Sequence, residues 1–413
     1  MAVAIGRLSQ RFRLLLEESN ADAKLRFYGE PTVKELTEQL KALGYDWELF
    51  TVNPITNSYD VRLSKQGTSF LVSEASSGER ELLTYLFAIF ALNVRNAVII
   101  VDEPELHLHP RWQSSLLALF VKLSKSTGNQ FIFATHSPTF ISPRSIQYVS
   151  RVYSEQQRSN IVRMNSADLP NIKHLFNIVN SENNQRMLFS DAVVLVEGLH
   201  DRMVFERILS ILVERSTGPT PTLEVVSIGG KGLFPAYQKL LDACKVPWWS
   251  VADLDYIEQI GSPDLKSLFA QNNDYIKTDV FENIKSRDGD TFVRLVEQAM
   301  QSGDWHDARD LWAYIKSRRR TLRDSLDPAQ EAALAEFIEQ CKTRRIYLLS
   351  RGALEDYLPV GYRSKDTEKL IELIGSDDFW DKLDLEGRRE LESMALIFLE
   401  TAAVPPQASQ PTE

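Results

Sequence analysis

Residues 191–201 read Asp-Ala-Val-Val-Leu-Val-Glu-Gly-Leu-His-Asp, and residues 248–255 read Trp-Trp-Ser-Val-Ala-Asp-Leu-Asp. Each stretch is a short apolar run that ends in acidic residues. Buried strands of a parallel sheet have this continuous apolar character, and ligands bind at their carboxyl ends. Carboxylates gathered there repel one another unless a divalent cation binds them. The two stretches therefore predict an acidic metal site at the edge of a parallel sheet.

The chain around these stretches alternates between strand and helix patterns. Strands are predicted at 191–196, 223–228 and 248–252, and helices at 201–213 and 233–244. This alternation indicates βαβ units and a parallel, Rossmann-like sheet.

Two further segments place polar groups near the predicted sheet edge. Gly229-Gly230-Lys231-Gly232 follows a strand, so its backbone can approach a ligand and Lys231 can donate to a phosphate. A later strand beginning at Ile346 leads to Arg351 and then to Gly-Ala-Leu-Glu355. Glu355 is either a further ligand or a surface acid.

The region from 70 to 150 carries a second set of motifs. Ser76-Ser77-Gly78-Glu79-Arg80 opens a helix over 81–91, and free N–H groups at a helix start can bind an anion, although a simple N-cap would look the same. The strand 97–101 ends in Asp102 and Glu103, which suit Mg²⁺ binding and orientation of a water. The strand 129–134 leads to His136, where an imidazole could touch a γ-phosphate.

In this order the motifs resemble the second half of an ABC-type ATPase head. The resemblance implies a signature loop, a Walker B pair and a switch histidine, and it assigns nucleotide binding to Ser76, Ser77, Gly78, Glu79, Asp102, Glu103 and His136. The phosphate-binding pattern G-x-x-x-x-G-K-[ST] is absent: the only Gly-Lys pair ends at Lys231, and position 225 is Val. Either the chain is the C-terminal portion of a longer ATPase, or its ATPase half has lost independent nucleotide binding. ATP would then be shared with a missing or partner half.

The acidic segments resemble a TOPRIM domain, in which Glu197 matches the strand-end glutamate and Asp253 with Asp255 the D-x-D pair. An ABC-type head followed by TOPRIM resembles the overcoming-lysogenisation-defect (OLD) family of nucleases. That resemblance implies two Mg²⁺ or Mn²⁺ ions held by Glu197, Asp201, Asp253, Asp255 and Glu355. It also implies a catalytic set of Glu197, Asp253, Lys231 and Arg351. Arg351 stands where the family usually has lysine, and arginine does not readily exchange a proton.

The implied function is a metal-dependent DNA endonuclease, controlled by an ATPase head that forms a homodimer or higher oligomer, with a role in phage defence. One alternative is a non-catalytic scaffold or DNA sensor in a multi-subunit complex, with a partner subunit. Another is a TOPRIM nucleotidyl transferase, which would need basic residues near Asp255, where the following Tyr-Ile-Glu-Gln supplies none.

Length and composition agree with an α/β protein of two to three domains that acts away from membranes. The 413 residues carry a net charge of -10, and no apolar run approaches the roughly 20 residues that span a bilayer. Two cysteines, with no spacing typical of disulfides or zinc, favour a reducing cytoplasm. The predicted organisation is a partial ABC-type ATPase domain at 1–150, a connector at 151–190, a TOPRIM domain at 191–400 with a helical insertion at about 256–340, and a disordered tail at 401–413.

Overall fold

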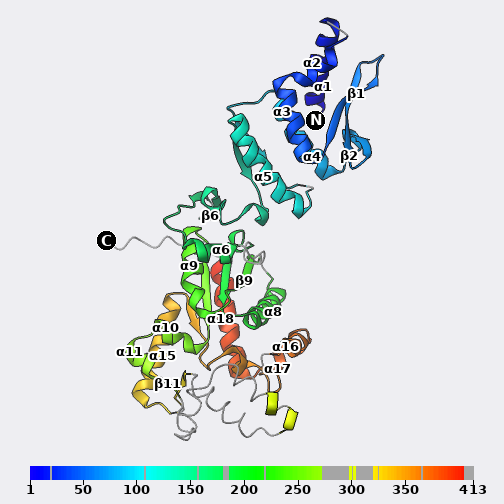
Figure 1. Ribbon diagram of the computed structural model, residues 1–413. Coiled ribbons are helices and arrows are strands. Elements are labelled where there is room, and N and C mark those ends of the chain that lie inside the picture. Colours follow the sequence, from blue (N-terminus) through cyan, green and yellow to red (C-terminus); the bar gives the residue numbers. More distant parts are fainter. Residues whose placement is uncertain are drawn as a thin grey trace, which may run out of the picture. The chain divides into compact units, whose positions relative to one another are not determined.

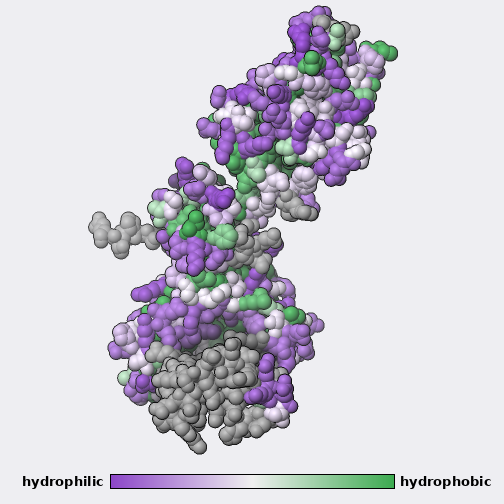
Figure 2. Space-filling view, in the orientation of Figure 1, coloured by the Kyte–Doolittle hydropathy of each residue, from purple (hydrophilic) through white to green (hydrophobic). Residues whose placement is uncertain are grey.

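The computed structural model describes residues 1–18, 21–106, 108–155, 158–179, 186–217, 220–271, 297–299, 301–303, 320–323, 325–363 and 366–403. The chain forms two compact units, Met1–Ser142 and Pro143–Glu413 (Figure 1). Where Figure 2 is coloured, hydrophilic residues cover most of the visible surface of each unit. In the described part of the chain, no helix combines the length and the apolar character needed to cross a membrane.

The first unit is built from helices around an antiparallel sheet and a separate parallel pair of strands. In chain order its elements are α1 (Ala2–Glu18), α2 (Ala23–Gly29), α3 (Pro31–Ala42), β1 (Asp46–Asn53), β2 (Ser58–Lys65), β3 (Thr68–Leu71), α4 (Ser77–Ala91), β4 (Val98–Asp102), α5 (Pro110–Thr127) and β5 (Gln130–Ala134). The strands β1, β2 and β3 form one sheet, in that order. A single buried core joins α1, α3 and α4 to this sheet and to α5.

Among the described residues, the parallel pair β4–β5 is covered on only one face. Phe131 and Phe133 point toward α5, where their rings lie 4.9 and 4.8 Å from the ring of Phe120. On the other face Ile100 is 74% exposed and Ile132 is 55% exposed. Parallel strands in folded domains are normally covered on both faces, so this bare apolar face is unusual.

The second unit contains the predicted parallel sheet. Its strands and helices are β6 (Ser150–Glu155), β7 (Arg158–Arg163), α6 (Ile172–Val179), β8 (Ala192–Val196), α8 (Leu199–Arg215), β9 (Leu223–Ser227), α9 (Phe234–Ala243), β10 (Trp248–Ala252), α10 (Ile257–Ile260), α11 (Pro263–Ser267), β11 (Phe269–Gln271), β12 (Arg320–Leu322), α15 (Pro328–Thr343), β13 (Ile346–Leu348), α16 (Thr367–Ile374), α17 (Phe379–Lys382) and α18 (Leu385–Ala403). The strand order is β13-β10-β8-β9, and every pairing is parallel. The predicted α/β fold with a parallel sheet is therefore confirmed.

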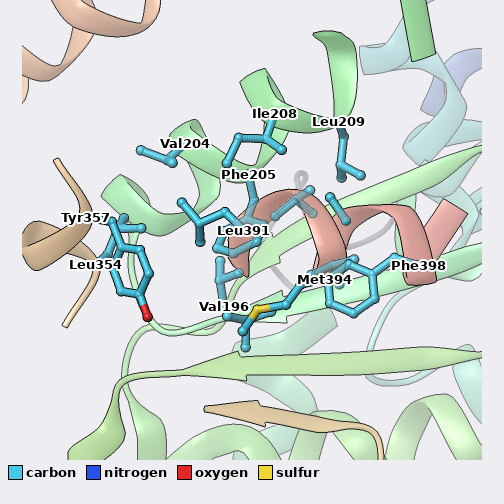
Figure 3. Close-up of a cluster of buried hydrophobic side chains, with 14 of the residues drawn as sticks. Val196, Val204, Phe205, Ile208, Leu209, Leu354, Tyr357, Leu391, Met394 and Phe398 are labelled. Carbon is cyan, nitrogen blue, oxygen red and sulfur yellow. The ribbon is translucent and has the colours of Figure 1, made fainter. Parts of the chain in front are cut away.

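Helices cover both faces of this sheet, which explains why its central strands are apolar throughout. All five residues of β8 and of β10 are buried. On one face, α8 and α18 pack over the sheet, and Figure 3 shows Phe205, Leu391 and Phe398 converging there. On the other face, the α9 residue Gln238 donates a side-chain hydrogen bond to Ser250 of β10 at 2.9 Å. The sheet is thus covered on both faces up to its carboxyl edge.

Three expected segments have more structure than their predictions describe. The segment expected as a connector includes the antiparallel hairpin β6–β7 and lies in the second unit. The insertion at about 256–340 is not purely helical, because β11 and β12 pair antiparallel; residues 272–296 and 304–319 of it lie outside the described residues. Helix α18 continues to Ala403, past the expected start of the tail, and residues 404–413 lie outside the described residues.

Candidate metal centre

The carboxyl ends of β8 and β10 bring two acidic residues together. The strands pair in parallel with Val251 opposite Val196, so Glu197 and Asp253 both leave the sheet at the same edge. The backbone N–H of Asp253 donates to the Glu197 carboxylate at 3.3 Å. One short 3-10 turn later, Asp255 joins them.

Glu197, Asp253 and Asp255 form a compact cluster of possible metal ligands. Each offers a carboxylate oxygen, and these oxygens all lie within 4.8 Å of one another. Within the described residues this is the one group of three or more such side chains that could hold an ion. Oxygen-only ligands of this kind suit Mg²⁺ or Mn²⁺ better than softer metals.

The electrostatics of the cluster would favour a bound cation. Burial, followed by the charge of Asp255, raises the pKa of Glu197 to about 7. Burial, followed by the charge of Glu197, raises the pKa of Asp253 to about 7. Crowded, half-buried carboxylates resist ionisation because each charge loses hydration and meets like charges. A bound cation would reverse this by favouring the ionised form of each.

A further observation shows that the residues fit a metal ion. The Oδ1 atom of Asp255 is buried and has no hydrogen-bond partner among the described residues. A buried carboxylate oxygen without a donor is costly. Coordination to a cation would satisfy this oxygen. The cluster therefore has the ligand atoms, and one unpartnered buried oxygen, that an oxygen-ligand metal site would have.

Two other predicted ligands, Asp201 and Glu355, lie near this cluster but are not part of it. Asp201 sits in the first turn of α8, where its Oδ2 accepts a hydrogen bond from the Gly198 N–H at 2.7 Å. A narrow pocket is lined by Asp201 together with Glu197 and Asp253. Asp201 and Glu355 also contribute to the raised pKa of Asp253.

The segment that carries Glu355 is tied directly to the D-x-D segment. The backbone N–H of Leu354 donates to Asp253 Oδ1 at 3.2 Å, and the N–H of Leu254 donates to the Gly352 carbonyl at 2.7 Å. These bonds hold the short turn Leu354–Tyr357 beside the cluster. Sequence reasoning proposed Glu355 but not these backbone links, which leave no sequence signal.

Lys231 reaches the cluster from the glycine turn after β9. Its Nζ lies 2.5 Å from Asp255 Oδ2, so the lysine is paired with one of the clustered carboxylates. Its charge also lowers the pKa of Glu197 relative to what burial alone would give. The predicted lysine therefore belongs to the same site as Glu197 and Asp255.

Arg351 forms ion pairs with acids outside the cluster. Its guanidinium nitrogens lie 2.7 Å from the Asp384 carboxylate and 3.3 Å from the Glu386 carboxylate. The guanidinium carbon, Cζ, lies 5.5 Å from the centre of the Tyr357 ring. Its ion pair with Asp384 raises the pKa of Arg351 further. Sequence reasoning missed Asp384 and Glu386, because acids at the start of a surface helix normally signal only a favourable helix terminus.

The predicted signature segment forms the start of α4. Ser76 is the N-cap, and its Oγ accepts from the Glu79 N–H at 3.4 Å. The Glu79 carboxylate accepts from Tyr45 Oη at 2.7 Å, which lowers the pKa of Glu79. Lys65 also donates to Tyr45 at 3.1 Å. Ser77 and Gly78 begin the helix itself.

Asp102, Glu103 and His136 meet at the carboxyl edge of β4–β5. Asp102 pairs with Ala134 in the strand register, and Glu103 follows with its N–H bonded to the Ala134 carbonyl at 2.8 Å. His136 Nε2 lies 3.5 Å from Glu103 Oε1. The structure thus brings the predicted Walker B glutamate and switch histidine together.

Sequence reasoning missed Glu105, which organises this edge. Its Oε1 accepts hydrogen bonds from Thr135 Oγ1 at 2.5 Å and from the N–H groups of His136 and Ser137, both at 3.0 Å. One carboxylate thereby fixes the loop that presents His136. In the sequence, this role could have been inferred from the third acid of the segment Asp-Glu-Pro-Glu at 102–105.

Comparison with known families matches one family to each of the two units. The AAA domain family whose description names the AbiEii toxin and a type IV toxin–antitoxin system matches residues 10–142. The TOPRIM domain of the overcoming lysogenization defect protein-like family matches residues 188–255, which include Glu197, Asp201, Asp253 and Asp255.

Several nucleases are similar to this chain. Old nuclease of Escherichia phage P2 is 23% identical over 287 residues, covering 68% of this chain and 46% of that protein. OLD nuclease of Thermus scotoductus is 25% identical, covering 40% of this chain and 32% of that protein. Endonuclease GajA of Bacillus cereus is 25% identical, covering 36% of this chain and 25% of that protein. The chain matches less than half the length of each relative. The two family matches show that the chain joins an AAA-type ATPase domain to an OLD-like TOPRIM domain.

Proposed function

We propose that this chain is a metal-dependent endonuclease that hydrolyses phosphodiester bonds in DNA. The observation that carries the proposal is the cluster of Glu197, Asp253 and Asp255 at the carboxyl edge of a parallel sheet. The names of the similar nucleases support a nuclease, and the choice of DNA follows the family resemblance.

In this proposal the chain's own residues divide into ligands and phosphate-binding groups. Glu197, Asp253 and Asp255 hold Mg²⁺ or Mn²⁺, and Asp201 and Glu355 complete the set for a second ion. Such a pair of ions activates a water and stabilises the leaving 3′ oxygen in an in-line displacement.

Lys231 and Arg351 would neutralise charge on the phosphate. Lys231 already lies at the cluster, whereas Arg351 would have to release Asp384 and Glu386 to reach a substrate. A guanidinium stays protonated at neutral pH, so Arg351 would act by charge and not by proton transfer.

Cleavage of supercoiled plasmid with Mg²⁺, and then with Mn²⁺, tests the proposal. The wild-type chain should nick or linearise the plasmid, and Asp253→Ala should not, although it folds. Asp264→Ala is the matched control, because Asp264 is an exposed acid on α11 that lies outside the acidic cluster. Undiminished cleavage by Asp253→Ala would rule out the site.

We further propose that the first unit binds ATP only together with a phosphate-binding segment that its own motifs lack. The bare face of β4–β5 supports this idea, because Asp102 lies on the same exposed face as Ile100 and Ile132. A segment covering that face would also complete the sheet. By resemblance, paired heads would form a dimer that gates the nuclease, in a role against phage.

A non-catalytic scaffold or DNA sensor is the alternative, and the same missing motif favours it. The plasmid-cleavage assay separates this alternative from the nuclease, because a scaffold would leave the plasmid intact. An ATP-binding titration of this chain alone tests both ideas about the first unit. Tight binding would contradict both the scaffold and the shared site. The two cysteines are free and buried, which fits the proposed cytoplasmic location.

A further inference from the structure

The backbone that precedes Lys231 is anchored to a residue of the acidic cluster. The N–H groups of Gly229 and Gly230 donate to the Glu197 carbonyl oxygen at 3.1 and 3.0 Å. Gly230 has φ +125°, a conformation that side-chain-bearing residues rarely adopt. The lysine backbone therefore stays beside the end of β8, whichever way its side chain points.

The lysine side chain forms an ion pair with one carboxylate oxygen of Asp255, Oδ2. Its Nζ lies 2.5 Å from Oδ2, while the other oxygen, Oδ1, is buried. The two side chains are 31% and 43% exposed, so water reaches the pair. Within the described part of the chain, no other lysine or arginine forms an ion pair with Glu197, Asp253 or Asp255. Lys231 is thus the resident counter-ion of the cluster.

An ammonium group and a divalent cation compete for the same carboxylate lone pairs. Lys231 has to release Oδ2 before Asp255 can use that oxygen as a ligand. The pair is partly exposed, and such ion pairs are weak enough to exchange. The lysine stem has four carbons and turns freely, so the released ammonium remains at the site on its anchored backbone.

We propose that Lys231 switches between Asp255 and a substrate phosphate, so that metal and phosphodiester bind cooperatively. This inference rests on the proposed nuclease function and adds a control to it. Without nucleic acid, the lysine weakens metal binding by occupying Asp255. With nucleic acid, the phosphate accepts the released ammonium. Coupling between two ligands is reciprocal, so the metal strengthens phosphodiester binding by the same factor.

The test is titration of the full chain with Mn²⁺, followed by electron paramagnetic resonance of the free ion, with and without a short phosphorothioate duplex that resists cleavage. The variants are Lys231→Met, which removes the charge at similar length, and Lys231→Arg, which keeps it. Lys239→Met is the matched control, because Lys239 is an exposed lysine on the neighbouring helix α9. Circular dichroism checks that each variant is folded.

We expect Lys231→Met to bind Mn²⁺ about twofold to fivefold more tightly than the wild type when no duplex is present. The duplex should then improve its affinity by a correspondingly smaller factor than it improves the wild type. Lys231→Arg and Lys239→Met should behave like the wild type. Equal or weaker Mn²⁺ binding by Lys231→Met would overturn the switch while leaving the nuclease proposal intact. Absence of Mn²⁺ binding by the wild type would overturn both.

Discussion

The carboxylate of Asp253 accepts a hydrogen bond from the backbone N–H of Leu354 at 3.2 Å, across a sequence separation of 101 residues. A second bond, from Leu254 to the Gly352 carbonyl at 2.7 Å, lies directly beside it. Together they fasten the turn that carries Glu355 to the strand end that carries the D-x-D pair. The geometry of the site therefore depends on the backbone at Gly352 as well as on its acids.

Gly352→Ala should destabilise the second unit. Gly352 has φ +122°, and an added Cβ would lie 2.7 Å from the Asp356 carboxylate. A strained backbone of this kind costs on the order of 1–3 kcal/mol. Thermal unfolding measures the loss. Gly232→Ala is the control, because its φ is ordinary and nothing lies within 4 Å of its added Cβ. Equal melting temperatures for both variants would contradict the strain.

The metal-free protein should lose stability as pH rises between about 4 and 7. In the folded chain the pKa values of Glu197 and Asp253 are both about 7, whereas the ordinary pKa values of the two side chains are 4.5 and 3.8. A folded state that binds more protons than the unfolded state is most stable at low pH, and it loses that advantage as pH rises through the folded pKa. Glu197→Gln should flatten this dependence in melting curves recorded with chelator, and Asp264→Asn should not.

Addition of Mg²⁺ or Mn²⁺ at pH 8 should restore the stability lost at that pH. A ligand that binds only the folded state stabilises it by about 2.7 kcal/mol at a concentration 100 times its Kd. Wild-type protein should melt at a higher temperature with the metal, and Asp253→Asn should show little change. KCl at equal ionic strength distinguishes site binding from screening, since a pure salt effect would raise both proteins equally.

Arg351→Ala should lower the cleavage rate at least about tenfold while metal affinity stays unchanged, if the guanidinium contacts substrate phosphate. Asp384→Asn removes the shorter of the two ion pairs that hold that guanidinium, leaves the Glu386 pair in place, and should not lower the rate. Arg388→Ala is the control, because Arg388 on α18 pairs with a different acid, Asp381, at 3.1 Å. A lower rate in Asp384→Asn as well would indicate that the pair, and not the free arginine, supports the site.

Ile100→Thr should change the stability of the first unit by less than about 0.5 kcal/mol, because its side chain lies on the bare face of β4–β5. Phe133→Ala should cost about 2 kcal/mol or more, since that ring packs on Phe120. Urea denaturation measures both. A large loss for Ile100→Thr would mean that the face is covered in solution by another copy or segment.

The sequence by itself determined the parallel sheet and its acidic edge. Apolar strands such as 192–196 and 248–252 are readable because burial on both faces removes polar residues from every position. Their acidic ends follow from the parallel arrangement, which places all carboxyl ends together. The order of Ser76, Asp102 and His136 was equally readable, since nucleotide chemistry requires those residue types at helix and strand ends.

Only the tertiary structure decided which predicted residues share a site. It grouped Glu197 with Asp253 and Asp255, paired Lys231 with Asp255, and tied Arg351 to Asp384. It also revealed Glu105 as the organiser of the His136 loop. These outcomes depend on backbone hydrogen bonds and side-chain directions between segments far apart in the chain. Local sequence patterns do not encode them, because any acid within reach could have formed the same ion pair.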